Sequence, residues 1–240
     1  DVYLTTDDEV VLMHNTTLAE TTNVESVNGG VDANRNIETM SLAEIRQYRL
    51  DQYGDEEIPI LEDVLAELVK TDIVFVLEIK STNNEIVPLI KEKLDEYDCY
   101  DQVVIISFSL ATLGEVKNVM PQVPTAYLGS PSVNSFANDL VWLGNYNTNV
   151  DMNYGGVTQE LNAMLRDRGF IGWYWTYATT ISVRQAASLG YVGLTTDSAE
   201  YYVNHARDKY RNPERLVGTE TQLEAGAPLA VGDTISLTLV

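Results

Sequence analysis

Short apolar runs alternate with amphipathic segments along the chain from about residue 10 to residue 202. The apolar runs have the length and the β-branched composition of buried strands. The predicted strands are VVLM (10–13), IVFVLEIK (73–80), VVIISF (103–108), PTAYLG (124–129), FIGWYWTY (170–177) and YVGLTTD (191–197), with a further short strand near Asn149–Asn153. Between them, the apolar stripes recur at helical spacing. The predicted helices cover 58–70, 83–97, 110–120, 158–169, 181–190 and 198–210.

Continuous apolar strands that alternate with helices predict a parallel sheet covered on both faces. About seven such repeats favour a closed (β/α)₈ barrel of the TIM type over an open sheet. No Gly-rich phosphate motif follows the first strand, which argues against a Rossmann domain. We therefore expect an α/β barrel that lacks its first strand in this chain.

The apolar pattern of the sequence changes after Arg211, where helical spacing ends. The chain then closes with the alternating segment TISLTLV. This predicts two parts, a barrel over residues 1–211 and a β-rich tail over 212–240. We expect the tail to be a linker followed by the start of a β-module or by an arm on the barrel.

The chain carries a net charge of −21, with 36 acidic and 15 basic residues. Binding to duplex nucleic acid needs clustered Lys and Arg, and no such cluster is present, so a nucleic-acid partner is not expected. An anionic substrate would be repelled unless a cation or a local basic side chain offset this field. The single cysteine, Cys99, excludes an internal disulfide and a Cys-rich zinc site.

In a barrel, the chemistry sits where the strands end, so ionisable residues at strand ends are the candidates. Glu78 and Lys80 lie two apart near the end of one strand and therefore point to the same side. They are either a buried ion pair or a metal-binding carboxylate beside a phosphate-binding ammonium. His14 follows the strand at 10–13, either as a half-buried side chain with a backbone partner or as a proton-transfer group.

Two further residues are candidates with plain structural alternatives. Asp1 would end a preceding strand, or it is a frayed terminus. Trp175 would line a pocket near the rim, or it packs in the core. Two carboxylates, a lysine and a histidine on successive strand ends form a set for phosphoryl transfer, and the hard oxygen ligands select Mg²⁺ or Ca²⁺.

These residues lie in motifs that resemble the glycerophosphodiester phosphodiesterase family. DVYLTTDDEVVLMHNTTLAETT is similar to the family's strand, turn and V-V-x-H-D-x-x-L-x-R-T-T. SLAEIRQYRL and EEIPILEDVL resemble its T-L-x-E-L and I-P-T-L-E-E-V-L, and LEIK, IISFS, YWTY and GLTTD follow in the family's order. The resemblance covers about residues 1–202.

The resemblance implies a barrel of the phosphatidylinositol-phospholipase-like kind with one divalent cation, Mg²⁺ or Ca²⁺. It implies hydrolysis of glycerophosphodiesters to glycerol 3-phosphate and an alcohol, with a cyclic phosphate formed through the glycerol 2-hydroxyl. In this picture His14 is one of two acid/base histidines, and Asp1 and Glu78 are metal ligands. Lys80 contacts the phosphate, and Trp175 lines the substrate pocket.

The sequence departs from the family pattern in several places. The family's H-R and a Glu two residues before the position of Asp1 are absent, Asn15 replaces the usual Asp, and Glu20 stands where Arg is common. We expect that residues are missing upstream of Asp1, and that the chain as given is inactive without this second His and metal-binding Glu. A degenerate relative is the other explanation.

The main alternative function is a catalytically degenerate barrel that acts as a ligand-binding or cell-surface module. A third reading is a phosphoester lyase of the same barrel type. The predicted partner is a small-molecule phosphodiester, with a membrane lipid or a cell-wall polymer as a further substrate class. The acidic charge and the tail favour an extracellular or bacterial cell-surface location, with the cytoplasm left open. The oligomeric state, the metal and the alcohol head group are not predicted.

Overall fold

The computed structural model describes residues 1–51, 56–69, 71–129, 140–177 and 193–197 of the 240. Two compact units divide the chain, and each is described by itself. The first covers Asp1–Gly129 and Ala137–Asn149, and the second covers Ser130–Phe136 and Val150–Val240. The predicted helices at 181–190 and 198–210 and the predicted tail at 212–240 lie outside the described residues.

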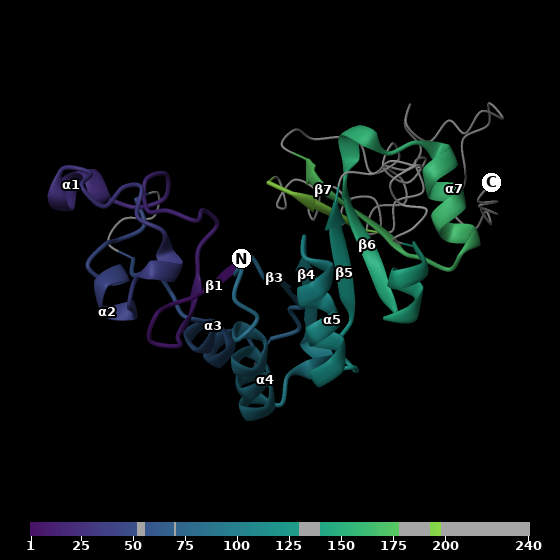
Figure 1. Cartoon of the computed structure of the whole chain (residues 1–240), viewed down its shortest axis with the longest axis horizontal. Helices are drawn as coiled ribbons and strands as arrows, with labels where there is room; N and C mark the ends of the chain where they lie inside the picture. The colour runs from purple at the N-terminus through teal and green to yellow at the C-terminus, as the bar shows by residue number, and fades with distance from the viewer. Residues whose placement is uncertain (52–55, 70, 130–139, 178–192, 198–240) are drawn as a thin grey trace, which may run out of the picture. The chain divides into compact units, whose positions relative to one another are not determined.

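The first unit is built on three parallel strands, β3 (Phe75–Glu78), β4 (Val103–Ser107) and β5 (Thr125–Gly129), in the order β3-β4-β5. Helices connect them: α4 (Ile86–Tyr97) follows β3, and α5 (Leu110–Val119) follows β4. The helix α3 (Leu61–Leu68) precedes β3, and Figure 1 shows α3, α4 and α5 grouped beside these strands. The pattern of apolar runs predicted all six elements correctly, because both faces of a parallel sheet are buried.

A core of buried apolar side chains joins these helices to the strands. It includes Leu65 of α3, Leu77 of β3, Ile90 of α4, Ile105 of β4 and Leu113 of α5, none more than 7% exposed. Cys99 lies at the edge of this core, where burial raises the pKa of its thiol. The core fixes where β3 and β4 end, and therefore where the polar residues that follow them lie.

The strand predicted at 10–13 is not a barrel strand. The structure pairs β2 (Val10–Leu12) antiparallel with β1 (Val2–Leu4) as a hairpin. β1 itself lies beside the end of β3, since Val2 forms a parallel bridge with Ile79 and the Lys80 N–H donates to the Val2 carbonyl at 3.2 Å. A run of apolar residues predicts a strand but not its partner, and here the Thr5–Glu9 turn reverses the chain.

The segment between β2 and α3 forms a separate small core, for which the apolar pattern had made no prediction. It holds three short elements, α1 (Val24–Asn28), the 3₁₀ helix η1 (Ile37–Thr39) and α2 (Leu42–Ile45). Its core joins the hairpin to these elements through Val11, Leu18, Val24, Ile37 and Ile45, all fully buried. Figure 1 shows α1 and α2 together, apart from α3–α5.

The first unit also contains a short 3₁₀ helix and the first two residues of a further strand. The 3₁₀ helix η2 (Tyr100–Gln102) leads into β4. Residues Thr148 and Asn149 begin β6 (Thr148–Asn153), and the hydroxyls of Thr148 and Thr125 share a hydrogen bond of 2.7 Å. The short strand predicted near Asn149–Asn153 is therefore present.

The second unit contains the rest of β6, with β7 (Gly172–Tyr177) and β8 (Gly193–Thr196) parallel in the order β6-β7-β8. The 3₁₀ helix η3 (Tyr154–Gly156) and the helix α7 (Gln159–Asp167) connect β6 to β7. Thr158 caps α7 as predicted, because its hydroxyl accepts from the Leu161 N–H at 3.1 Å. The alternating residues of β7 face opposite ways: the Tyr174 hydroxyl donates to Asn162 of α7, so Trp173 and Trp175 lie on the other face of the sheet.

Candidate active site

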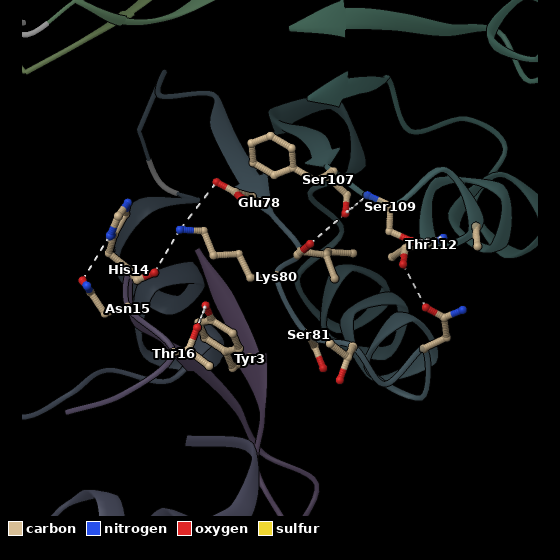
Figure 2. A pocket seen from close by; sticks show the side chains of 15 residues that line it. Tyr3, His14, Asn15, Thr16, Glu78, Lys80, Ser81, Ser107, Ser109 and Thr112 are labelled. Atoms are coloured by element: carbon tan, nitrogen blue, oxygen red, sulfur yellow. Dashed lines mark hydrogen bonds and ion pairs between the residues drawn. The ribbon is translucent and has the colours of Figure 1, made fainter. Parts of the chain in front are cut away.

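Four of the five predicted site residues come together in the first unit. The Lys80 ammonium lies 3.5 Å from the Asp1 carboxylate and 3.9 Å from the Glu78 carboxylate, and it donates to the His14 backbone carbonyl at 2.9 Å. In Figure 2, Lys80 reaches from one side toward Glu78 and toward the His14 backbone. The acid, the base and the histidine therefore lie at one end of β3. The spacing of Glu78 and Lys80 predicted their shared side, whereas His14 comes there through the hairpin.

The hairpin brings Asp1 and His14 to this mouth. Asp1 directly precedes β1, and its predicted place at the end of a preceding strand stays a prediction. Because Val2 pairs with Ile79, the start of β1 is level with the end of β3, where Glu78 lies. The antiparallel return of β2 then places the residues after Leu12 beside Asp1, and the Met13 N–H donates to the Asp1 carbonyl at 3.1 Å.

The charged side chains are largely shielded from solvent. The exposed fractions are 18% for the Lys80 side chain, 14% for Glu78 and 25% for Asp1. Burial lowers the pKa of the Lys80 ammonium, and the neighbouring Glu78 carboxylate opposes that shift. Among the side chains alone, two carboxylates and one ammonium leave a local negative charge, which an added cation would offset.

Glu78, Lys80 and His14 line a cavity of about 750 Å³ whose other polar side chains are mainly hydroxyls. The hydroxyls come from β1, from the loops after β2 and β3, from the end of β4 and from the start of α5. They belong to Tyr3, Thr16, Ser81, Thr82, Ser107, Ser109 and Thr112. Figure 2 shows Tyr3 and Thr16 on the hairpin side and Ser107, Ser109 and Thr112 on the α5 side. The volume is within the range of ligand sites in proteins, roughly 300–1,000 Å³.

The hydroxyl residues were not among the predicted site residues, although a signal for some of them exists. Ser81 follows β3 and Ser107 ends β4, so they occupy the same kind of strand-end position as Glu78 and Lys80, but the rule considered only ionisable residues. Ser107 is tied down, since its hydroxyl donates to the Ile79 carbonyl at 2.8 Å and accepts from the Ser109 N–H at 3.1 Å. Ser109 caps α5 by accepting from the Thr112 N–H at 3.1 Å.

Glu38 connects the separate small core to the loop that follows β3. Its carboxylate accepts from the Ser81 hydroxyl at 2.5 Å and from the Thr82 N–H at 3.1 Å. Glu38 belongs to η1, far from the loop in sequence, so this contact could not be read from local pattern. It holds the segment that directly follows Lys80.

Trp175 belongs to β7 in the second unit, where its indole N–H donates to the Asp151 carbonyl at 3.2 Å. Its predicted part in lining the substrate pocket stays a prediction. A second, more apolar cavity of about 250 Å³ in the first unit also includes Asp1 and His14 in its lining.

Comparison with known proteins identifies the family. The model of the family described as Glycerophosphoryl diester phosphodiesterase matches residues 1–201. The chain belongs to this family. A glycerophosphodiester phosphodiesterase of Caldanaerobacter subterraneus is 26% identical over 216 residues, covering 86% of this chain and 84% of the relative. One from Bacillus altitudinis is 24% identical over 202 residues, covering 82% and 80%.

Solved structures of phosphodiesterases share the fold. A phosphodiesterase from Oleispira antarctica, in complex with the product sn-glycerol-3-phosphate, gives a TM-score of 0.74 at 19% identity, covering 86% of this chain and 83% of that one. A glycerophosphodiester phosphodiesterase from Parabacteroides distasonis gives 0.68 at 21% identity, covering 86% and 82%. The predicted α/β fold and the predicted glycerophosphodiester phosphodiesterase family are confirmed.

Two features are absent from the described residues. Within them, no three side chains of the His, Cys, Asp and Glu types gather closely enough to hold a metal ion by themselves. No helix in that part of the chain has the length and apolar character needed to cross a membrane. The roles of Asp1 and Glu78 as metal ligands, of His14 as an acid/base group and the expected inactivity of the chain as given stay predictions.

Proposed function

We propose that this protein hydrolyses glycerophosphodiesters to glycerol 3-phosphate and an alcohol, with a divalent cation and with His14 as a proton-transfer group. The observation that carries the proposal is the position of Lys80: its ammonium is within 4 Å of both the Asp1 and the Glu78 carboxylates, in a cavity that His14 also lines. Family membership and the glycerol 3-phosphate bound by the Oleispira antarctica phosphodiesterase support the same substrate class.

The donor set fits a hard divalent cation. Mg²⁺ is usually held by one or two carboxylates, with water and substrate phosphate completing its coordination. Asp1 and Glu78 would supply these carboxylates, and the shielding of both side chains favours pairing with a cation over leaving them in apolar surroundings. When bound, such an ion polarises the phosphoryl oxygens and balances the charge that develops on them.

Lys80 and the hydroxyls bind and orient the substrate. The ammonium of Lys80 offers a compact positive charge to a phosphate oxygen, and its contact with the His14 carbonyl holds it at the mouth of the cavity. Ser81, Ser107 and Ser109 follow or end strands at the same rim, where hydroxyl groups can exchange hydrogen bonds with a glycerol moiety. His14 would shuttle a proton to or from the ester oxygens, which is the usual role of a positioned imidazole.

The test is release of glycerol 3-phosphate from glycerophosphocholine. It is run on the purified protein, including any residues that precede Asp1 in its natural form, with Mg²⁺, Ca²⁺ or Mn²⁺ and with a chelator. Glu78→Gln is compared with Glu92→Gln, which changes an exposed carboxylate on α4. We expect cation-dependent turnover that Glu78→Gln reduces at least 100-fold and Glu92→Gln leaves unchanged.

The other outcomes identify the alternatives. Binding of glycerol 3-phosphate by calorimetry without turnover under any of these cations would show a ligand-binding module with a degenerate site. A cyclic phosphate as the final product would show a lyase. If the protein shows neither binding nor turnover, the placement of the site is overturned. Phosphodiesters of membrane lipids or cell-wall polymers stay predicted substrates, for which glycerophosphocholine is only the simplest probe. The extracellular location also stays a prediction.

A further inference from the structure

A chain of three side chains runs outward from the imidazole of His14. The Nδ1 atom of His14 lies 3.1 Å from the amide oxygen of Asn15. The Asn15 amide nitrogen in turn donates to the Glu20 carboxylate at 2.5 Å. All three belong to the loop after β2, and Figure 2 shows the contact between His14 and Asn15 at one side of the cavity.

The chemistry of these groups permits one arrangement of hydrogens. A carboxylate at neutral pH only accepts hydrogen bonds, so Glu20 must receive an N–H from Asn15. If the amide were turned around, its oxygen would face the carboxylate and two acceptors would repel. Glu20 therefore decides which end of the amide faces the histidine. Because that end is an oxygen, the Nδ1 atom of His14 must carry the hydrogen.

The tautomer matters because the two ring nitrogens do different work. In a neutral imidazole, a hydrogen on Nδ1 leaves the lone pair on Nε2, and the partner of one nitrogen sets the state of the other. The His14 backbone is held separately by its carbonyl, which accepts from Lys80. The contact with Lys80 fixes the position of the His14 backbone, and the contact with Asn15 fixes the orientation of the imidazole ring.

We propose that Glu20 is a positioning residue that acts through Asn15 to hold neutral His14 in its Nδ1–H tautomer, which leaves Nε2 to exchange a proton with the substrate. The role of Nε2 rests on the proposed function, whereas the tautomer does not. Asn15 and Glu20 are also the two positions near His14 where the sequence departs from the family pattern, and the structure shows that they contact each other. An amide needs an outside group to select its orientation, and Glu20 supplies it.

Nitrogen-15 magnetic resonance of the imidazole tests the tautomer directly. The chain has two histidines, His14 and His205, so protein labelled only at histidine gives two ring systems, and His205→Gln assigns them. Two-bond ¹H–¹⁵N correlations at a pH where the ring is neutral distinguish Nδ1–H from Nε2–H. We expect Nδ1–H to dominate for His14. Glu20→Ala should shift the population toward Nε2–H, the tautomer that an imidazole in water prefers.

Two variants separate the loss of an acceptor-only group from a general loss of structure. Glu20→Asp keeps a carboxylate, which only accepts hydrogen bonds, so it should retain the Nδ1–H tautomer. Glu56→Ala removes a carboxylate from an exposed position of the same unit and should change nothing. In the phosphodiesterase assay, Glu20→Ala should lower kcat roughly tenfold, and Glu20→Asp should retain most of the kcat of the unmodified protein.

The outcomes keep the two proposals apart. An Nε2–H tautomer in the unmodified protein, or a tautomer that Glu20→Ala leaves unchanged, would overturn the positioning role whatever the activity. The expected tautomers in a protein without phosphodiesterase activity would retain the positioning role and overturn the proposed function. An altered tautomer with unchanged kcat would overturn the assignment of Nε2 as the reacting atom. Thermal unfolding of each variant confirms that it is folded.

Discussion

The Met13 N–H donates to the Asp1 carbonyl at 3.1 Å, and this contact closes the hairpin that brings His14 beside Asp1. The pairing of Val2 with Leu12 continues the same ladder, while Val2 on its other side bridges Ile79 at the end of β3. The strand β1, which follows Asp1, therefore lies between the two other elements of the site. These are β2, which leads to His14, and β3, which carries Glu78 and leads to Lys80. The site depends on the register of this hairpin, because a slip by one residue would turn each of its side chains to the opposite face.

Replacing His14 tests its proposed role in proton transfer. We expect His14→Gln to lower kcat for glycerophosphocholine by about 10²–10⁴-fold, because a positioned acid/base group contributes a factor of this size. The side chain is exposed, so the unfolding temperature should change little. The matched control is His205→Gln, the same change at the other histidine of the chain. Equal activity of His14→Gln and the unmodified protein would remove His14 from the mechanism.

Replacing Lys80 tests the charge balance between the two carboxylates. Lys80→Met leaves Asp1 and Glu78 without the ammonium that now lies between them. We expect a loss of about 1–2 kcal/mol in the free energy of unfolding in chelator, because the three side chains are shielded but not fully buried. Mg²⁺ should then raise the unfolding temperature of this variant more than that of the unmodified protein. Lys91→Met, on the exposed side of α4, is the control. Identical responses of Lys80→Met and the unmodified protein to Mg²⁺ would contradict two-carboxylate metal binding.

Asp151 gives the second unit a pH-dependent stability. Its carboxyl is 1% exposed, and neither oxygen has a hydrogen-bond partner within the described part of the chain, so burial raises its pKa from 3.8 to about 7. Between those values the folded protein holds a proton that the unfolded chain has released. The free energy of unfolding that this group contributes is therefore fully present below about pH 4 and is lost as the pH rises through 7. Each pKa unit is worth about 1.4 kcal/mol, so the loss is on the order of 4 kcal/mol.

Urea unfolding at pH 5 and pH 8 measures this dependence. Asp151→Asn should be more stable than the unmodified protein at pH 8 and should lose much of the difference between the two pH values. Asp167→Asn changes an exposed carboxyl on α7 and should leave the pH dependence intact. A pH dependence that survives Asp151→Asn would mean that another group causes it.

Gly193 allows an indole to lie across β8. Trp173 pairs with Gly193, and a Cβ added at this glycine would come within 3.0 Å of the Trp173 ring. We expect Gly193→Ala to destabilise the protein by about 1–3 kcal/mol, the usual cost of overpacking. At Gly114 in α5, the nearest atom would be at an ordinary 3.4 Å, and an alanine suits a helix better than a glycine. Gly114→Ala should therefore be neutral or stabilising, and equal effects at the two positions in urea unfolding would refute the packing argument.

The sequence by itself determined the elements whose signal is local. Strands β3, β4, β5 and β7 and helices α3, α4, α5 and α7 follow from apolar runs and stripes, because burial on both faces of a sheet or along one face of a helix sets the residue types directly. The shared face of Glu78 and Lys80 also follows, since strand residues two apart point the same way. These are properties of a few consecutive residues, and no distant partner is needed to predict them.

Only the tertiary structure decided which segments meet. The residues of β2 form a strand as predicted, but pairing with β1 rather than insertion in the parallel sheet depends on contacts that local periodicity does not encode. The same holds for the place of Asp1 beside the end of β3, for the contact of Glu38 with the loop after Lys80, and for the hydroxyls that line the cavity. The site is assembled from long-range pairings, and a hydrophobic pattern specifies that a residue is buried without specifying against what.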